Sequence, residues 1–277
     1  RKGTEEVARL RLADIGADLS PYPYALCFAQ DEHERYLVGK LASLGVAVEW
    51  GTELVALAQD DAGVRATLRR RGKDGVESPG ETCAVDYLCG CDGAHSRVRQ
   101  LLGIDFPGDT YEQPFYVADV RVDGLAEDDL FVSVGADTLA LMLPVRGSGT
   151  KRFIGNVPHA LAGKADLSFA DVQPHAEALL GVHATELLWF SAYRVHHRVA
   201  TRFGEGRVFI AGDAGHVHSP AGGQGMNTGI GDAYNLAWKL AQVLRGEMPA
   251  SLLQSYEPER IAFARKLVET TDRAFQA

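Results

Sequence analysis

The sequence lacks several features that would place it in a special class of protein. No apolar run approaches the roughly 18 residues that cross a bilayer, and no basic segment followed by an apolar one opens the chain, so we expect no membrane partner and a cytoplasmic location. Four cysteines in 277 residues are too few for a disulfide scaffold. The 28 lysines and arginines are outnumbered by 37 aspartates and glutamates, which argues against a nucleic-acid surface because phosphate binding needs clustered cations.

The cysteines themselves are expected to be buried, reduced thiols. Cys89 and Cys91 close an apolar stretch and are separated by one residue, whereas zinc knuckles and redox pairs keep two residues between their cysteines. The other two cysteines are Cys27 and Cys83. The motifs HExxH and GxSxG, typical of zinc peptidases and serine hydrolases, do not occur. The sequence therefore predicts neither a disulfide framework nor a resident metal.

The order of the predicted elements indicates an α/β fold that carries an inserted sheet. An apolar, aromatic segment at 21–30 is a predicted strand, and it leads to a helix that starts at Asp31, which can cap it, and stops at Gly45. Strands are then predicted at 46–50, 53–59, 64–70 and 83–90. A second, β-rich set occupies 115–122, 139–145, 152–157 and 187–200, with a short helix at 171–181. The chain returns through a buried strand at 207–213 and ends in helical sequence at 251–275, interrupted at Pro258.

The segment after the strand at 207–213 is poor in side chains. Asp213 stands at the carboxyl end of the strand, where open α/β sheets place ligand-binding groups. Pro220, Gly225 and the glycines between them let a ligand approach the main chain, and the amides that start the next helix favour an electron-rich or anionic group. Two alternatives stay open: a plain glycine loop with Asp213 as a helix cap, and a metal site made by Asp213, His216 and His218.

Several stretches, in the same order along the chain, resemble those of one enzyme family. The stretch 206–241, GRVFIAGDAGHVHSPAGGQGMNTGIGDAYNLAWKLA, resembles the Gly-Asp region of class A FAD-dependent aromatic hydroxylases of the p-hydroxybenzoate hydroxylase type, in the branch of the phenol and polyketide hydroxylases. CGCDGAHSRVRQLLGI, from Cys89, is similar to the family's Asp-Gly motif. ALCFAQDEHERYL, from Ala25, is similar to its flavin-contacting segment, and LLQSYEPERIAFA, from Leu252, to the end of its catalytic unit.

The resemblance implies roles for individual residues. Asp213 would bond the ribityl or pyrophosphate part of FAD, and the amides of Met226 and Asn227 would face the pyrimidine edge of the isoalloxazine. The Asp-Gly motif would serve FAD and NAD(P)H together. The cofactor-binding residues are thus expected to be Gln30, Leu54, Asp92, Arg99, Gly212, Asp213, Pro220, Gly225, Met226 and Asn227. No residue is assigned to the chemical step itself.

Substrate residues are expected in the inserted sheet and at the flavin loop, because ligands bind in the cleft between two such parts. The candidates are Met142, Phe190, Tyr193, His216, His218 and Pro220. Ordinary core packing is an equal alternative for the apolar members of this set. The histidines would hydrogen-bond the substrate or flavin or carry a proton from a phenol, with a purely structural hydrogen bond as the alternative.

The fold implied is α/β, or α+β over the whole chain: a p-hydroxybenzoate hydroxylase-like FAD-binding fold, truncated at its N-terminus, with an inserted, mainly antiparallel substrate-binding sheet. The FAD-binding domain would comprise 24–110 and 201–250, the sheet domain 1–23 and 111–200, and a C-terminal helical segment 251–277. The family's GxGxxG turn does not occur, and the chain opens on Arg1 rather than Met. We therefore expect a piece of a longer enzyme.

The function implied is hydroxylation of a phenolic or polyketide-type aromatic. NAD(P)H would reduce FAD, O2 would add to the flavin, and a flavin C4a-hydroperoxide would hydroxylate the ring. The alternative is a degenerate relative that binds an aromatic ligand without FAD. The expected partners are an aromatic small molecule and O2, with no nucleic acid and no membrane, and a homodimer is left open.

Overall fold

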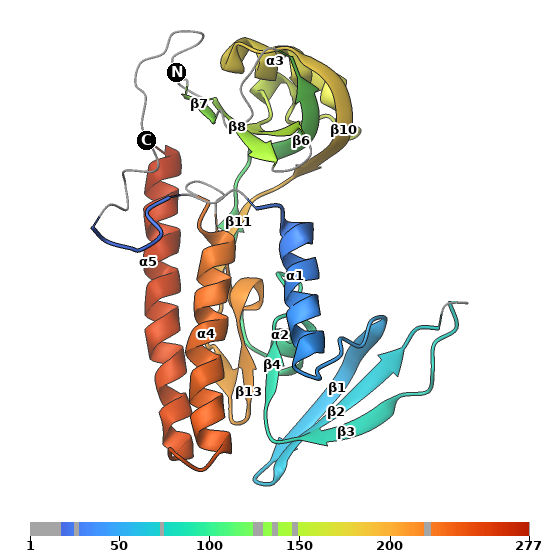
Figure 1. Ribbon diagram of the computed structural model, residues 1–277, viewed down its shortest axis with the longest axis vertical. Helices are drawn as coiled ribbons and strands as arrows, with labels where there is room; N and C mark the ends of the chain where they lie inside the picture. The colour runs from blue at the N-terminus through green and yellow to red at the C-terminus, as the bar shows by residue number, and fades with distance from the viewer. Residues whose placement is uncertain are drawn as a thin grey trace. The chain divides into compact units, whose positions relative to one another are not determined.

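The computed structural model describes residues 18–24, 28–72, 75–123, 130–134, 138–145, 149–218 and 223–276. The chain folds into two compact units, each assembled from two separate segments. Unit 1 comprises Arg1–Val48 and Glu112–Arg194, and unit 2 comprises Glu49–Tyr111 and Val195–Ala277. Helices and strands occur together, so the α/β class predicted from the sequence is confirmed (Figure 1). None of the helices in the described part of the chain is long and apolar enough to cross a membrane.

Unit 1 is built on a five-stranded antiparallel sheet with the strand order β10-β6-β9-β8-β7. The strands are β6 (Phe115–Val122), β7 (Phe131–Val134), β8 (Leu139–Val145), β9 (Thr150–Asn156) and β10 (Ala184–Tyr193). Helix α3 (Phe169–Leu180) follows a short 3-10 turn, η2 (His159–Leu161), and covers one face of the sheet (Figure 1). Alternate residues such as Tyr116, Ala118 and Val120 point to that face and pack with Val172 and Ala176 of α3. The inserted sheet is therefore stabilised by a core of its own.

Helix α1 (Gln30–Ser43) differs in detail from its prediction. Ala29 is the N-cap, and Asp31 lies inside the first turn, where its carboxylate pairs with Arg35 at 2.7 Å. The prediction that Asp31 caps the helix is therefore wrong, because an i,i+4 ion pair occupies its side chain. The described part of the predicted strand at 21–30 has no strand before the helix, and residues 25–27 lie outside the described residues.

The described residues of unit 2 form three small sheets and three α-helices. Strands β1 (Thr52–Asp60), β2 (Gly63–Arg70) and β3 (Glu81–Val85) form an antiparallel sheet. Strand β4 (Leu88–Gly90) pairs in parallel with β13 (Val208–Ile210), which pairs with β12 (Gly204–Glu205). Strand β11 (His196–Val199) joins β5 (Gly108–Thr110) and β14 (His216–Val217). The helical segments are α2 (Arg97–Leu101), η3 (Gly212–Ala214), α4 (Gly225–Leu244), η4 (Ala250–Ser255) and α5 (Tyr256–Gln276).

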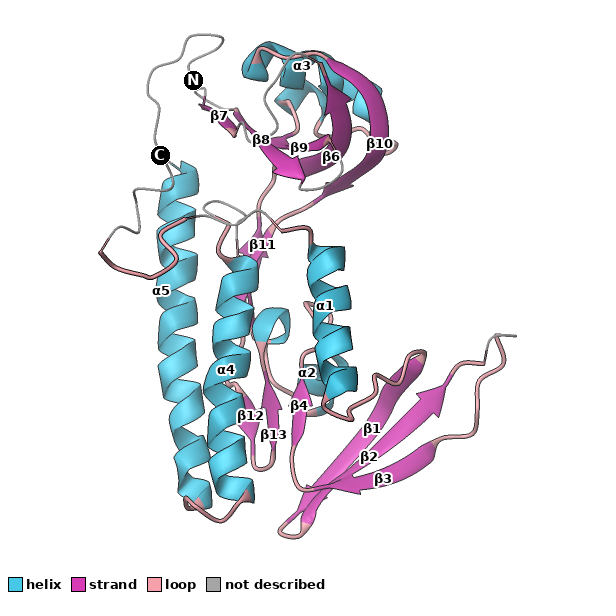
Figure 2. Ribbon diagram, in the orientation of Figure 1, coloured by secondary structure: helices cyan, strands magenta, loops and turns pink. Residues whose placement is uncertain are grey.

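Helices α4 and α5 lie side by side in unit 2 (Figure 2). The core beneath them joins Leu236 of α4 and Tyr256 of α5 to Phe203, Phe209 and Ile210 around β13. The Tyr256 hydroxyl donates to the Ile210 carbonyl at 2.8 Å, so the strand end is held directly by α5. This packing sets the position of the turn that follows β13.

Three further predictions are corrected in unit 2. The segment 46–50 forms no strand: Val46, Val48 and Trp50 are exposed, and no described strand pairs with them. The predicted strand at 83–90 is two strands, β3 and β4, which belong to different sheets. Pro258 does not interrupt the last helix, because it lies in the first turn of α5, where a missing N–H leaves no helical bond unmade.

The prediction of buried cysteines is wrong for Cys89 and Cys91, which are both exposed, while Cys83 is half-buried. The cause lies in the strand order. Among the strands that the structure describes, β4 pairs with β13 alone and stands at the edge of its sheet, so an apolar sequence there does not bury its side chains. Cys27 lies outside the described residues.

Candidate active site

The turn after β13 presents a single exposed carboxylate. All three residues of β13 are buried, and the chain then forms the 3-10 turn η3, in which Ala214 is buried and Asp213 is exposed. Gly212 has φ +62°, a left-handed conformation that favours glycine. A Cβ on Gly229 of α4 would lie 3.4 Å from the Gly212 Cα, so the turn packs closely on the helix. Asp213 therefore stands at the carboxyl end of a buried strand, on a turn that packs closely against α4.

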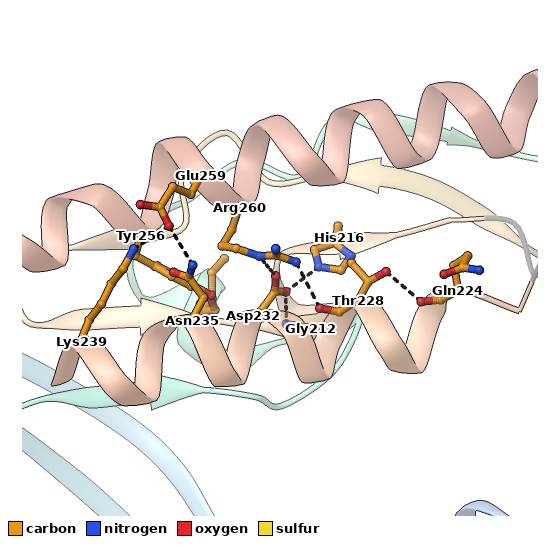
Figure 3. Close-up of polar contacts among 11 residues, drawn as sticks. Gly212, His216, Gln224, Thr228, Asp232, Asn235, Lys239, Tyr256, Glu259 and Arg260 are labelled. Carbon is orange, nitrogen blue, oxygen red and sulfur yellow. Dashed lines mark hydrogen bonds and ion pairs between the residues drawn. The ribbon is translucent and has the colours of Figure 1, made fainter. Parts of the chain in front are cut away.

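The turn is anchored by a buried carboxylate that the sequence did not reveal (Figure 3). Asp232 of α4 is completely buried and accepts three hydrogen bonds. The donors are the Gly212 amide at 3.0 Å, His216 Nε2 at 2.7 Å and Arg260 Nε at 2.6 Å. One side chain thus joins the turn, strand β14 and helix α5.

The electrostatics of this cluster favour the charged carboxylate. Burial alone raises the pKa of Asp232, but the hydrogen bond and charge of His216, the hydrogen bond from Arg260 and that from the Gly212 amide outweigh burial and leave the pKa below its usual range. Asp232 is therefore a fixed negative charge. Its three donors orient the turn rather than leaving the carboxylate free for chemistry.

A second ion pair extends the contact between α4 and α5. Glu259 accepts hydrogen bonds from Lys239 Nζ and Asn235 Nδ2, both at 2.7 Å (Figure 3). Lys239 is almost fully buried, so its ammonium depends on this partner. The contact with Lys239 is also the main reason that the pKa of Glu259 is lowered.

The residues of the Asp-Gly motif organise a neighbouring turn. Asp92 accepts the Ser96 hydroxyl at 2.5 Å and the amides of Arg97 and Val98 at 2.7 and 3.0 Å. Ser96 is the N-cap of α2 and accepts the Arg99 amide at 3.0 Å. Asp92 therefore acts on the N-terminus of α2, as expected of a carboxylate at a helix start.

Arg99 connects this turn to the turn after β13. Its guanidinium is buried and donates to the Ala214 carbonyl and the Ala94 carbonyl, both at 2.8 Å, and it stacks on the Phe106 ring at 3.9 Å. Burial lowers the pKa of Arg99, and the Asp92 charge opposes that shift. Two sequence motifs more than a hundred residues apart are thus joined by one hydrogen bond, between Arg99 and Ala214.

The start of α4 offers backbone donors that the helix itself does not use. The first hydrogen bond within the helix runs from the Thr228 amide to the Gln224 carbonyl at 2.9 Å, so the amides of Gly225, Met226 and Asn227 have no carbonyl partner inside the helix. Met226 and Asn227 are exposed. A helix of 20 residues lies behind these amides, so its dipole adds to their attraction for an electron-rich group.

The structure places the remaining predicted residues as follows. Gln30 lies on α1 of unit 1, exposed, and donates to Glu34 at 3.0 Å. Met142 is fully buried in the unit 1 core, and the Phe190 ring stacks on Tyr116 at 6.4 Å. Tyr193 is exposed at the end of β10, yet burial of its hydroxyl raises its pKa.

Leu54 is half-buried in β1 of unit 2 and packs against the core. His218 is half-buried, and its Nε2 lies 3.8 Å from the position of a Cβ on Gly225. Pro220 lies outside the described residues. Unit 2 thus brings together the predicted cofactor residues of the two motifs and of the α4 start, whereas Gln30, Met142, Phe190 and Tyr193 belong to unit 1.

The metal alternative finds no support in this geometry. His216 is buried and directs Nε2 to Asp232, while Asp213 is exposed on the turn. Within the residues that the structure describes, no group of three or more histidine, cysteine, aspartate or glutamate side chains is arranged to hold a metal ion.

The sequence contained a signal for the missed cluster. Thr228, Asp232, Leu236 and Lys239 recur every three or four residues and are the buried residues of α4. An aspartate and a lysine on the apolar stripe of an amphipathic helix are expensive to bury alone, so each predicts a buried partner. The identity of those partners, Arg260 and Glu259, requires the packing of α5.

Comparison with known proteins gives a family match over most of the chain. The model of the FAD binding domain family matches residues 1–271. The chain is 38% identical over 272 residues to pentachlorophenol 4-monooxygenase of Sphingobium chlorophenolicum, covering 94% of this chain and 48% of that protein. It is 40% identical over 264 residues to 6-methylpretetramide 4-monooxygenase of Streptomyces rimosus, covering 91% of this chain and 45% of that protein. The chain thus spans about half the length of these curated relatives.

A solved structure shows the same fold with a cofactor. The ternary complex of aklavinone-11 hydroxylase with FAD and aklavinone superposes with a TM-score of 0.80 at 29% sequence identity. The match covers 94% of this chain and 50% of the solved chain. The similarity therefore extends over both units.

Proposed function

We propose, from the premise that this chain belongs to the FAD binding domain family and shares its fold with flavin-dependent aromatic monooxygenases, that the protein hydroxylates an aromatic substrate. When bound, FAD supplies the oxygen chemistry, with NAD(P)H as the reductant and a flavin C4a-hydroperoxide as the hydroxylating species. The proposed substrate is a phenolic or polyketide-type ring, because the relatives are named for a chlorinated phenol and a pretetramide. The co-substrate is O2.

Unit 2 has an acceptor and donors that suit the ribityl chain and the flavin ring of FAD. Asp213 can accept hydrogen bonds from the hydroxyls of a ribityl chain. The amides of Gly225, Met226 and Asn227 can donate to the pyrimidine edge of the flavin, where negative charge gathers on reduction. Asp213 is exposed on its turn, and the three amides precede the first hydrogen bond within α4. The elements that carry these groups therefore do not use them.

The observation that carries the proposal is the contrast between Asp213 and its surroundings. A buried aspartate, bonded in turn to a histidine and an arginine, fixes the position of the turn. Arg99 adds a hydrogen bond to the Ala214 carbonyl of the same turn. Asp213 alone is exposed on it. A network of this kind around one exposed carboxylate is typical of a binding group that must be held in a fixed place.

The chain's residues would act by binding and positioning. Arg99 and Asp92 would keep the two motifs in register beneath the cofactor, and the α4 amides would stabilise the charge of the reduced ring. Tyr193 and Phe190 of unit 1 are proposed to contact the aromatic substrate, and His218 to bond the substrate or flavin. NAD(P)H is proposed to share the Asp-Gly motif with FAD.

The test is made on the protein expressed at its natural length. Titration with FAD should quench flavin fluorescence with a one-to-one end point, and NAD(P)H oxidation should accelerate when a phenol or a polyketide aromatic is added. The product should contain one added oxygen atom, which mass spectrometry in 18O2 identifies as derived from O2. Light scattering on the same sample decides between a monomer and a homodimer.

Two variants sharpen the titration. Asp213→Asn should weaken FAD binding by about 10-fold to 100-fold, the equivalent of one hydrogen bond to a charged group. Asp166→Asn, an exposed aspartate of unit 1, is the matched control and should bind FAD like the wild type. A protein that stays colourless after reconstitution yet binds aromatic ligands would overturn the proposal in favour of an FAD-free binding module.

A further inference from the structure

Two cysteine thiols lie against each other at the carboxyl end of β4. The Sγ atoms of Cys89 and Cys91 are 3.6 Å apart, within hydrogen-bonding distance for sulfur. Both residues are exposed. The cofactor proposal assigns them no role.

The backbone explains why the two sulfurs meet. Alternate residues of an extended chain point to the same side, so Cys89 and Cys91 share one face of β4 while Gly90 points to the other. A Cβ on Gly90 would lie 2.6 Å from the Val98 Cβ, so α2 occupies the opposite face. The Ala211 amide binds the Gly90 carbonyl at 3.0 Å, and the strand ends there. Cys91 is thus the first residue beyond the ladder and is free to move toward Cys89.

The two thiols are not equivalent. The hydrogen bond between the sulfurs lowers the pKa of Cys91 and raises the pKa of Cys89. Cys91, the first residue beyond the strand ladder, is assigned as the nucleophile, and Cys89 as the thiol that attacks second.

We infer that Cys89 and Cys91 form a redox-active dithiol, which a hydroperoxide converts to a disulfide. The Cys91 thiolate attacks one peroxide oxygen, the O–O bond breaks, and the other oxygen leaves as water or an alcohol after taking a proton. Cys89 sulfur then attacks the resulting sulfenic acid, the S–O bond breaks, and hydroxide leaves as water with the Cys89 proton. Two electrons pass from the thiols to the peroxide, and an S–S bond replaces two S–H bonds.

The disulfide should be easily reduced. Two residues of extended chain span about 6.6 Å between Cα atoms, near the upper end of the range of roughly 4.4–6.8 Å that disulfides tolerate. Ring closure therefore strains the bond, and strained, exposed disulfides are the labile kind. Gly90 lowers the barrier to closure because its backbone is the least restricted of any residue. Such a site responds to peroxide and recovers with cellular thiols, unlike a structural disulfide.

The experiment treats the protein with stoichiometric hydrogen peroxide, blocks the remaining thiols under denaturing conditions and maps the peptides. Chymotryptic cleavage after Tyr87 separates Cys83 from the pair, so a Cys89–Cys91 disulfide appears in a peptide that starts at Leu88 and is lighter by two hydrogens. Glutathione should restore both thiols. The measurement needs neither bound flavin nor turnover, so its outcome is independent of the proposed monooxygenase activity.

Three single variants identify which cysteine sulfur reacts with the peroxide and which one closes the disulfide. Cys83→Ser, the matched control, should form the disulfide like the wild type. Cys89→Ser should stop at the Cys91 sulfenic acid, trapped by dimedone, and Cys91→Ser should lose most of its reaction with peroxide. Retention of both thiols in the wild type after a peroxide dose that oxidises free glutathione would overturn the inference. So would a disulfide that joins either residue to Cys83.

Discussion

Asp232 of α4 is a buried charge in unit 2, and its stability depends on its hydrogen-bond partners. Its carboxylate is fully buried, and the Arg260 side chain that faces it at 2.6 Å is 13% exposed. A buried charge of this kind stabilises the fold only while its partner is present, because each ion has lost most of its hydration. The exposed pair of Arg65 and Asp60 has a similar separation, 2.7 Å, but remains hydrated.

Asp232→Asn should therefore lower the free energy of unfolding by about 3–5 kcal/mol, the cost of leaving one buried partner uncompensated. Asn keeps an oxygen for the Gly212 amide but removes the charge opposite Arg260 and His216. Urea unfolding monitored by circular dichroism measures the change. Asp60→Asn is the control and should change the free energy of unfolding far less, because an exposed pair stays hydrated. Equal losses in the two variants would show that the Asp232 cluster is not a buried ion pair.

Helix α2 illustrates how an element too short to be stable alone is held in place. It has five residues, far fewer than an isolated helix needs. Asp92 and Ser96 satisfy its N-terminal amides, and Arg99 fixes it to the turn after β13. The position of α2 thus depends on side chains at its start rather than on its own propensity.

Ser96→Ala should reduce the stability of unit 2 by about 1–2 kcal/mol. The substitution leaves the buried Arg99 amide without its acceptor and removes one donor from Asp92. Thermal unfolding reports the loss, and hydrogen exchange should show faster exchange of the Arg99 amide. Ser251, exposed in η4, provides the control, since Ser251→Ala should change the stability by less than about 0.5 kcal/mol. Unchanged exchange at Arg99 would contradict the capping role of Ser96.

The elements that the sequence predicted are those determined by local patterns. β-Rich sequence predicted β6 and β8, and helices were predicted at 171–181, the site of α3, and after the glycine loop, the site of α4, because each pattern lies within a few residues. The order of the strands in the sheets and the partners of buried charged side chains were not predicted. Cys89 is exposed because β4 has a neighbour on one side only among the described strands, and Asp232 meets Arg260 only when α5 packs on α4. Among the candidate site residues, Asp213 and the α4 amides could be named because their geometry is that of one strand, one turn and one helix.

Both units contain carboxyl groups whose pKa is lowered, and Asp171 and Asp232 are an example from each. In unit 1, hydrogen bonds from Lys164 and from the Ser168 amide and hydroxyl hold the pKa of Asp171 at about 2. In unit 2, Asp232 is also lowered, against the effect of burial. A carboxyl with a lowered pKa in the folded state takes up its proton first in the unfolded chain, whose value is about 3.9. Its stabilisation is complete above that value and is lost as pH falls through the folded pKa.

Acid should therefore destabilise each unit through its own carboxyl groups, Asp171 and Asp232 among them, beginning below about pH 4. Tryptophan variants separate the signals: Trp189 reports on unit 1 when Trp50 and Trp238 are replaced by Phe, and these two report on unit 2 in Trp189→Phe. In urea titrations at falling pH, Asp232→Asn should flatten the pH dependence seen from unit 2 and leave that from unit 1 unchanged. Asp171→Asn should do the reverse. If both variants flatten both signals equally, the two units unfold as one, and the acid response belongs to the whole chain rather than to separate carboxyls.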